Sequence, residues 1–225
     1  MTWRLAEGPR RSVPALWLLP LSQPSPTADL TLQEQAWANA LPERRREHYQ
    51  WSRRWMRTLL GDLLRVPPSW LPLAAPPGQP PQLGDGWGFV SLSHCPDALL
   101  LAWAPWRIGV DVERSDRAIP AAALLRRYFC EQEQLSLKAL AAEPLRRAVL
   151  DHWVIKEAAV KWQQGSLGRD LVFWCCNADR DAVVDQRNGG VLSCWRWRYG
   201  AWTLALVSQD DMGCAPDCVL PMCVY

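Results

Sequence analysis

The sequence predicts an α+β protein made of two small subdomains, each with an antiparallel sheet packed with helices. The main observation is that a long helical stretch followed by three strand-like segments occurs twice. A length of 225 residues, 49% of them apolar, is enough to bury one large core or two smaller ones. The halves do not resemble each other in sequence, so the order of elements alone places a boundary near Arg107.

The first half is predicted to begin with a strand at residues 12–19 and to continue with a helical stretch at residues 32–64. Proline cannot continue a helix, so a break is expected near Pro42. After this break, apolar residues recur at four-residue steps and form one buried stripe. Arg53 and Arg57 are also four residues apart, so they share a neighbouring face of the same helix.

A segment rich in proline and glycine, residues 66–86, is predicted to be an irregular connection. Three strand candidates follow it at residues 88–94, 98–105 and 106–113. Because the turns between them are short, the sequence predicts a three-stranded antiparallel meander.

The second half repeats the order of helix and strands. Residues 120–141 are predicted to be helical, with a break at Phe129–Cys130, and residues 143–164 have a strong helical pattern. The strand candidates that follow are residues 170–177, 190–198 and 201–207.

Charge and cysteine content indicate the kind of partner and compartment. A net charge of +2 gives no indication of a nucleic-acid or membrane partner, and no apolar run reaches the roughly 20 residues of a membrane helix. The eight cysteines include no CxxC pair, and Cys214, Cys218 and Cys223 lack a following histidine that would indicate a zinc site. We therefore expect a cytoplasmic protein with reduced thiols.

The segment IGVDVE, residues 108–113, places two carboxylates two positions apart on a predicted strand. Side chains alternate along a strand, so Asp111 and Glu113 share one face, while Val110 and Val112 point to the other face and the core. Two adjacent carboxylates suit a hard cation such as Mg²⁺, which also binds substrate phosphates. The alternative is a solvated strand edge whose charge is offset by a neighbouring arginine.

The helical segment WVIKEAAVK, residues 153–161, carries Glu157 and Lys161 four positions apart. One interpretation is an ordinary surface salt bridge, since glutamate before lysine is the favourable order. The other is that Glu157 supplies a third metal ligand or a general base, and that Lys161 meets a phosphate one turn later.

A third motif, SLSH at residues 91–94, places Ser91 and Ser93 on one strand face, followed by His94. A serine hydrolase would need its nucleophile in a strained turn, and the sequence has no GxSxG motif. This class of enzyme is therefore not expected.

These three motifs, in this order, resemble those of the 4′-phosphopantetheinyl transferase superfamily, and most closely its larger, surfactin-synthetase-activating type. The segment RTLLGDLL, residues 57–64, is also similar to the helix that precedes them in that family. The resemblance implies two similar subdomains related by pseudo-twofold symmetry, residues 1–107 and 108–225. It also implies a monomer with the active site in the cleft between the subdomains.

The resemblance also implies roles for individual residues. Asp111, Glu113 and Glu157 would bind Mg²⁺ together with the pyrophosphate of coenzyme A. Glu157 would also deprotonate the acceptor serine, and Lys161 would hold pyrophosphate oxygens, so these two are the expected catalytic residues. The nucleotide end of coenzyme A would be bound by His94, Ser93, Arg57 and a basic residue between positions 44 and 46, such as Arg44. Lys156 would be structural or charge-balancing.

The implied reaction transfers 4′-phosphopantetheine from coenzyme A to a serine of an apo carrier protein and releases 3′,5′-ADP. The acceptor would be an acyl carrier protein or a carrier domain of a polyketide or peptide synthetase. Two alternatives remain open: a metal-dependent phosphohydrolase acting on coenzyme A or a nucleotide, and a non-catalytic homologue that only binds coenzyme A or carrier proteins. The sequence departs from the family at Gln79, where a lysine is common, and in the turn at residues 165–171.

Overall fold

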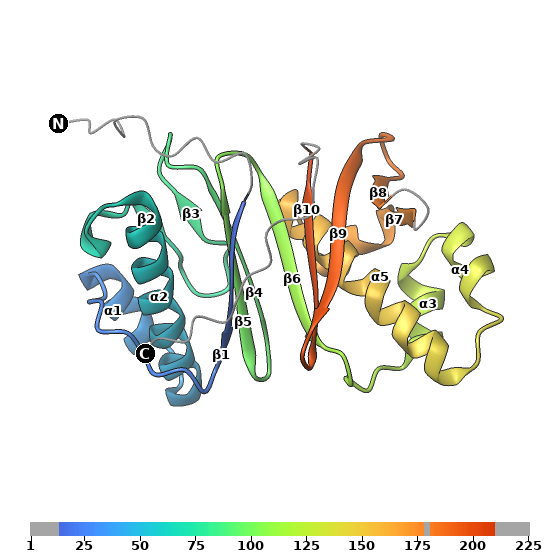
Figure 1. The fold of residues 1–225 in the computed structure, drawn as a ribbon, viewed down its shortest axis with the longest axis horizontal. Coiled ribbons are helices and arrows are strands. Elements are labelled where there is room, and N and C mark those ends of the chain that lie inside the picture. The colour runs from blue at the N-terminus through green and yellow to red at the C-terminus, as the bar shows by residue number, and fades with distance from the viewer. Residues whose placement is uncertain (1–13, 178–180, 210–225) are drawn as a thin grey trace.

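The computed structural model describes residues 14–177 and 181–209, and these residues form four stacked layers. Figure 1 shows two helices, then two antiparallel sheets face to face, then a second group of helices. The predicted α+β class, with small antiparallel sheets packed against helices, is confirmed. No described helix is long and apolar enough to cross a membrane.

The first sheet has three strands in the order β1-β5-β4, with bounds Ala15–Pro20, Ala98–Ala104 and Phe89–Cys95. Its outer face packs against α2, Glu43–Leu64, whose apolar stripe meets Leu99, Leu101 and Trp103. The shorter α1, Leu32–Asn39, begins at a capping box formed by Thr31 and Glu34. The connection between α2 and β4 contains a 3₁₀ turn and a two-stranded ribbon, at Pro68–Trp70, Leu73–Ala74 (β2) and Gln82–Leu83 (β3).

The second sheet has five strands in the order β6-β10-β9-β8-β7. Their bounds are Ile108–Arg114, Trp202–Ser208, Val191–Tyr199, Ala182–Asp185 and Trp174–Asn177. The outer face of this sheet packs against α5, Ala142–Trp162. Two shorter helices, α3 and α4, lie beside α5 at Ala121–Tyr128 and Glu131–Leu137.

The three strands of the first sheet have counterparts in the second sheet. In each half, a first strand is followed along the chain by helices, a short strand pair and a hairpin, and the second strand of the hairpin lies between the first strand and the other hairpin strand. Thus β1, β5 and β4 correspond to β6, β10 and β9. The pair β2–β3 forms a ribbon of its own, whereas β7 and β8 extend the second sheet. The apolar side chains between the sheets come from both, including Leu100 and Ala102 on one side and Val110 and Leu206 on the other.

The predicted meander is wrong in its third strand. The strand β6 does not extend the β4–β5 hairpin, because residues 105–107 carry the chain to the second sheet, where β6 pairs with β10. On its other side β6 does not pair with the backbone of any other described strand, and two of its amides donate to side chains of β4. The hydroxyl oxygens of Ser91 and Ser93 accept the amides of Val110 and Val112, at 3.1 and 3.4 Å.

One further predicted strand differs in its bounds, and one observed strand is absent from the prediction. Residues 170–177 form a strand only from Trp174, because α6 (Leu167–Asp170) and a 3₁₀ turn (Leu171–Phe173) precede it. The short strand β8 had no alternating apolar pattern long enough to predict it. The first two residues of the predicted strand at 12–19, and Cys214, Cys218 and Cys223, lie outside the described residues.

The helix α5 crosses β6 closely at Gly109. A Cβ atom added there would overlap the carbonyl oxygen of Ala158 and come within 2.7 Å of the Trp162 amide nitrogen. Gly109 therefore permits a distance between helix and strand that any side chain would prevent. Since side chains alternate along β6, the same face carries Asp111 and Glu113 toward α5.

We expect Gly109→Ala to destabilise the protein by about 1–3 kcal/mol, because the methyl group overpacks the contact between α5 and β6. The control is Gly168→Ala, where an added Cβ meets no atom within 4 Å. That change should be neutral or stabilise by less than about 1 kcal/mol. Urea unfolding of both variants checks the expectation, and equal stabilities would contradict it.

Candidate functional site

Three carboxylates converge where α5 crosses β6. Asp111, Glu113 and Glu157 each offer one oxygen, and these oxygens lie within 4.8 Å of one another. Asp111 is 2% exposed, and the side chains of Glu113 and Glu157 are each 12% exposed. This burial excludes the alternative of a fully solvated strand edge.

Lys161 lies beside this cluster and contacts both halves of the chain. Its ammonium donates to Asp111 Oδ1 at 2.6 Å and to Ser93 Oγ at 2.7 Å. The Ser93 hydroxyl in turn donates to Asp111 Oδ1 at 2.6 Å. The distance from Lys161 Nζ to Glu157 Oε2 is 3.9 Å, so the simple surface pair between these two residues is not the main interaction of Lys161.

The cluster carries more negative charge than its protein neighbours offset. Burial, with the charge of Asp111, raises the pKa of Glu157 to about 8, and the same two causes raise the pKa of Glu113, which also pairs with Arg117. Oδ2 of Asp111 is buried without a hydrogen-bond partner among the described residues. Oxygen ligands, excess negative charge and an unpartnered carboxylate oxygen fit a hard divalent cation such as Mg²⁺.

A cavity of about 430 Å³ lies against the carboxylates. Both halves of the chain line it: Gln79 and Pro80 from the proline-rich connection, Ser93 and His94 from β4, and Lys161 from α5. The altered turn contributes residues 165 and 167. Gln79 therefore lies at the cavity, where the family commonly has a lysine, and its side chain is a neutral amide.

A second cavity of about 420 Å³ shares Arg53, Gly78, Leu92 and His94 with the first. Its other lining residues include Arg44 and Arg45, which with Arg53 make it basic, and His48, whose pKa is lowered by burial. The rings of His48 and His94 lie 5.2 Å apart between their centroids. Of the predicted nucleotide-binding residues, the structure thus brings Arg44, Ser93 and His94 to these two adjoining cavities.

Arg57 is not brought to either cavity, which corrects the expected contact with the nucleotide. Its side chain is 1% exposed, and its guanidinium pairs with Glu34 at 2.7 Å and donates to the carbonyl oxygen of Pro68 at 2.8 Å. Arg53, one turn earlier, lines both cavities instead. It is held over the Tyr49 ring, 4.4 Å from the centroid, and donates to the Ala75 carbonyl oxygen.

Lys156 points away from the cavity into a buried cluster, in agreement with a structural role. Its ammonium pairs with Glu133 at 2.7 Å, and both side chains are almost fully buried. Glu133 also contacts His152 Nδ1 at 2.8 Å and accepts the amide of Cys176 at 3.2 Å. Glu133, His152 and Cys176 lie close enough together to hold a metal, but the Glu133 carboxylate is already paired with the Lys156 ammonium.

Not all thiols are reduced, contrary to the expectation from the sequence. Cys130 and Cys175 form a disulfide that joins the residue before α4 to β7. The spacing of 45 residues between them gave no signal for this pairing.

Comparison with known proteins bears on this site. Residues 107–212 match the model of the 4′-phosphopantetheinyl transferase superfamily. No curated protein matches the chain. The superfamily match includes the three carboxylates and Lys161, whereas Arg53, Ser93 and His94 precede it. The match supports phosphopantetheinyl transfer as the general kind of function, and thus a transferase.

Asp111→Asn should weaken Mg²⁺ binding by at least about tenfold, the loss typical of even an outer-shell change at a metal site. The variant lowers the charge of the cluster and replaces the unpartnered carboxylate oxygen. Calorimetric titration with Mg²⁺, and electron paramagnetic resonance with Mn²⁺, measure the effect. Asp116→Asn is the control, because Asp116 is exposed and pairs with Arg114 away from the cavity. Equal affinities for both variants would rule out the proposed ligand.

Arg57→Ala should destabilise the protein by about 3–5 kcal/mol, because it leaves Glu34 buried without a counter-charge. Arg147→Ala breaks an exposed pair with Glu143 and should cost less than about 1 kcal/mol. Chemical unfolding compares the two variants. A small loss for Arg57→Ala would mean that this ion pair does not hold α1 to α2.

Proposed function

We propose that the protein transfers 4′-phosphopantetheine from coenzyme A to a serine of an apo carrier protein, in a reaction that depends on Mg²⁺. The observation that carries this proposal is the convergence of three carboxylates and Lys161 beside a cavity that shares lining residues with a basic one. Such carboxylates can hold a metal ion that binds a diphosphate, and the arginines of the second cavity can bind a nucleotide phosphate. The superfamily match points to the same reaction.

Asp111, Glu113 and Glu157 would hold the cation, which supplies positive charge against the developing charge on the phosphoryl and leaving oxygens. Lys161 adds a fixed ammonium beside them, oriented by Ser93 and Asp111. The 3′-phosphate of the nucleotide would lie in the basic cavity, against Arg53, His94 and Arg44. Arg53 takes the role first expected for Arg57.

In the reaction, the serine oxygen forms a bond to the β-phosphorus of coenzyme A while the bond from that phosphorus to 3′,5′-ADP breaks. The serine proton passes to Glu157, directly or through one water. Positioning the serine in line with the leaving group contributes the remaining acceleration. The products are holo carrier protein and 3′,5′-ADP.

The finer assignments are also proposals. We propose the surfactin-synthetase-activating type, because the chain contains two similar halves and would form the site between residues 1–107 and 108–225 as a monomer. A fatty-acid, polyketide or peptide-synthetase carrier could be the acceptor. A cytoplasmic location is consistent with such a carrier.

Incubation with an apo carrier protein, coenzyme A and Mg²⁺ should increase the mass of the carrier by one phosphopantetheine group. Asp111→Ala and Glu157→Ala should lower the rate by at least about a hundredfold, because each removes charge stabilisation or the base. Asp116→Ala, which changes an exposed carboxylate outside the cavity, should leave the rate unchanged.

Three carrier classes should be tested in parallel. No mass increase with any of them would contradict the proposal. Release of 3′,5′-ADP or phosphate from coenzyme A without an acceptor would indicate a phosphohydrolase. Binding of coenzyme A with no turnover would indicate a non-catalytic homologue.

A further inference from the structure

Arg107 is a cation of the carboxylate cavity to which neither the motifs nor the mechanism above assigns a role. It immediately precedes β6 and lines the cavity together with Asp111 and Glu157. It lies four residues before Asp111, a separation of about 13 Å along an extended chain. Arg107 therefore stands at one end of the site, beyond the three carboxylates.

Trp162 of α5 holds Arg107 in two ways. The guanidinium carbon lies 5.6 Å from the centroid of the indole ring, within the range of a cation–π contact. The indole Nε1 also donates to the carbonyl oxygen of Arg107 at 3.1 Å. Both the backbone and the charged group of Arg107 are thus fixed before any ligand binds, which reduces the entropy lost on binding.

The guanidinium of Arg107 has no carboxylate partner within residues 14–177 and 181–209, and no acceptor there receives its N–H groups. The other cations of the cavity are engaged: Lys161 pairs with Asp111, and Arg53 donates to Ala75 and Ser52. An arginine held by its face keeps its N–H edge free, and this edge matches two oxygens of a phosphate.

We infer that Arg107 binds a phosphate oxygen of the coenzyme A diphosphate, an inference that rests on the proposed function. The diphosphate would then span the space between the carboxylates and Arg107, while the 3′-phosphate lies in the basic cavity. Gln79, which lines the same cavity, is neutral. Arg107 supplies a positive charge that the glutamine does not.

A phosphate fits this position better than an acidic side chain of a carrier protein. The cavity already contains three carboxylates, so a fourth would be repelled unless it arrived with its own cation. A diphosphate that shares Mg²⁺ with the carboxylates arrives with that charge compensated.

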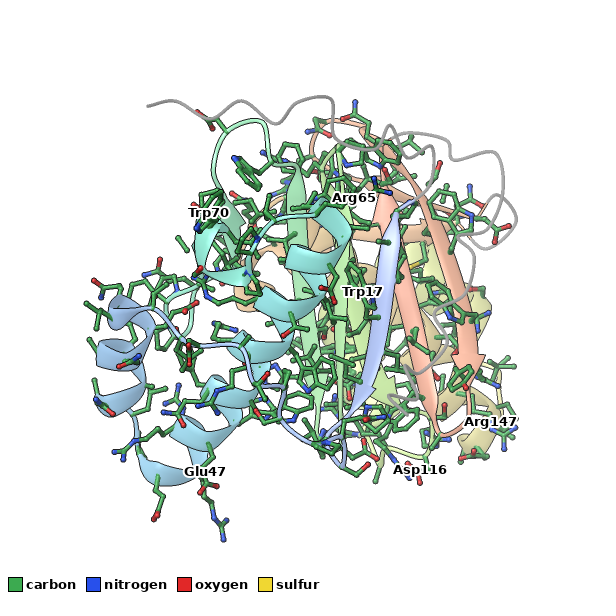
Figure 2. All side chains as sticks on the ribbon, turned by 60° about the vertical axis from the view of Figure 1, so that its left-hand side comes forward. Trp17, Glu47, Arg65, Trp70, Asp116 and Arg147 are labelled. Atoms are coloured by element: carbon green, nitrogen blue, oxygen red, sulfur yellow. A yellow bond between two sulfur atoms is a disulfide. The ribbon has the colours of Figure 1, made fainter. Side chains whose placement is uncertain are left out.

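The test is calorimetric binding of coenzyme A, and separately of inorganic pyrophosphate, in the presence of Mg²⁺. Arg107→Ala should weaken both by about tenfold, and Arg107→Lys should recover only part of the loss because lysine lacks the planar fork. Arg147→Ala, at an exposed arginine outside the cavity, should change neither. Figure 2 shows Arg147 at the periphery of the molecule.

The role of Trp162 is tested by a double-mutant cycle. If Trp162 acts by holding Arg107, the double variant Arg107→Ala, Trp162→Ala should bind coenzyme A no more weakly than the single variant with the lower affinity. Losses of binding free energy that add in the double variant would contradict that role. Arg107 is exposed, so Arg107→Ala decides the main question even if Trp162→Ala does not fold.

Unchanged affinity of Arg107→Ala for coenzyme A and pyrophosphate would overturn the inference. If the affinity for both is unchanged and only the KM for the carrier protein rises, Arg107 contacts the carrier and not the diphosphate, and the inference is equally overturned. The binding measurement does not need turnover. Weakened binding of coenzyme A by Arg107→Ala, in a protein that transfers nothing to any carrier, would refute the proposed function and leave the inference standing.

Discussion

The close approach of α5 to β6 at Gly109 is the contact on which the candidate site depends. Glu157 and Lys161 come from a helix, whereas Asp111 and Glu113 come from a strand 44–50 positions earlier in the chain. The helix carries them to the strand only because position 109 has no side chain. The buried apolar face of α5, including Val154 and Ala158, then fixes the helix against the second sheet. The close packing of α5 on β6 thus sets the distance between the charged groups of the helix and those of the strand.

Ser93 connects this packing with the first sheet. Its hydroxyl accepts from Lys161 and from the Val112 amide, and donates to Asp111. The same atom therefore belongs to the contact between β4 and β6 and to the polar network of the cavity. Although the superfamily match begins at residue 107, the site needs residues before that point, and Arg53 and His94 come from the same part of the chain.

The sequence predicts those parts of the site that depend on the side-chain period of a single strand or helix. Alternation along a strand placed Asp111 and Glu113 on one face and Val110 in the core, and the helical period paired Glu157 with Lys161. The choice between Arg53 and Arg57 could not be made this way, because both lie on one helix face and both are buried. Arg57 pairs with the distant Glu34, and Arg53 lines the two cavities. The position of β6 and the pairing of Cys130 with Cys175 also depend on tertiary contacts that no local pattern encodes.

The side-chain acceptors along β6 and β7 have a consequence for association between molecules. These are the two outer strands of the five-stranded sheet, where unpaired backbone amides would ordinarily be open to a strand from another molecule. Serine hydroxyls of β4 accept hydrogen bonds from two amides of β6, and the Glu133 carboxylate accepts one from the Cys176 amide of β7. The groups that shape the interior of this protein thus also protect the margins of its larger sheet against aggregation.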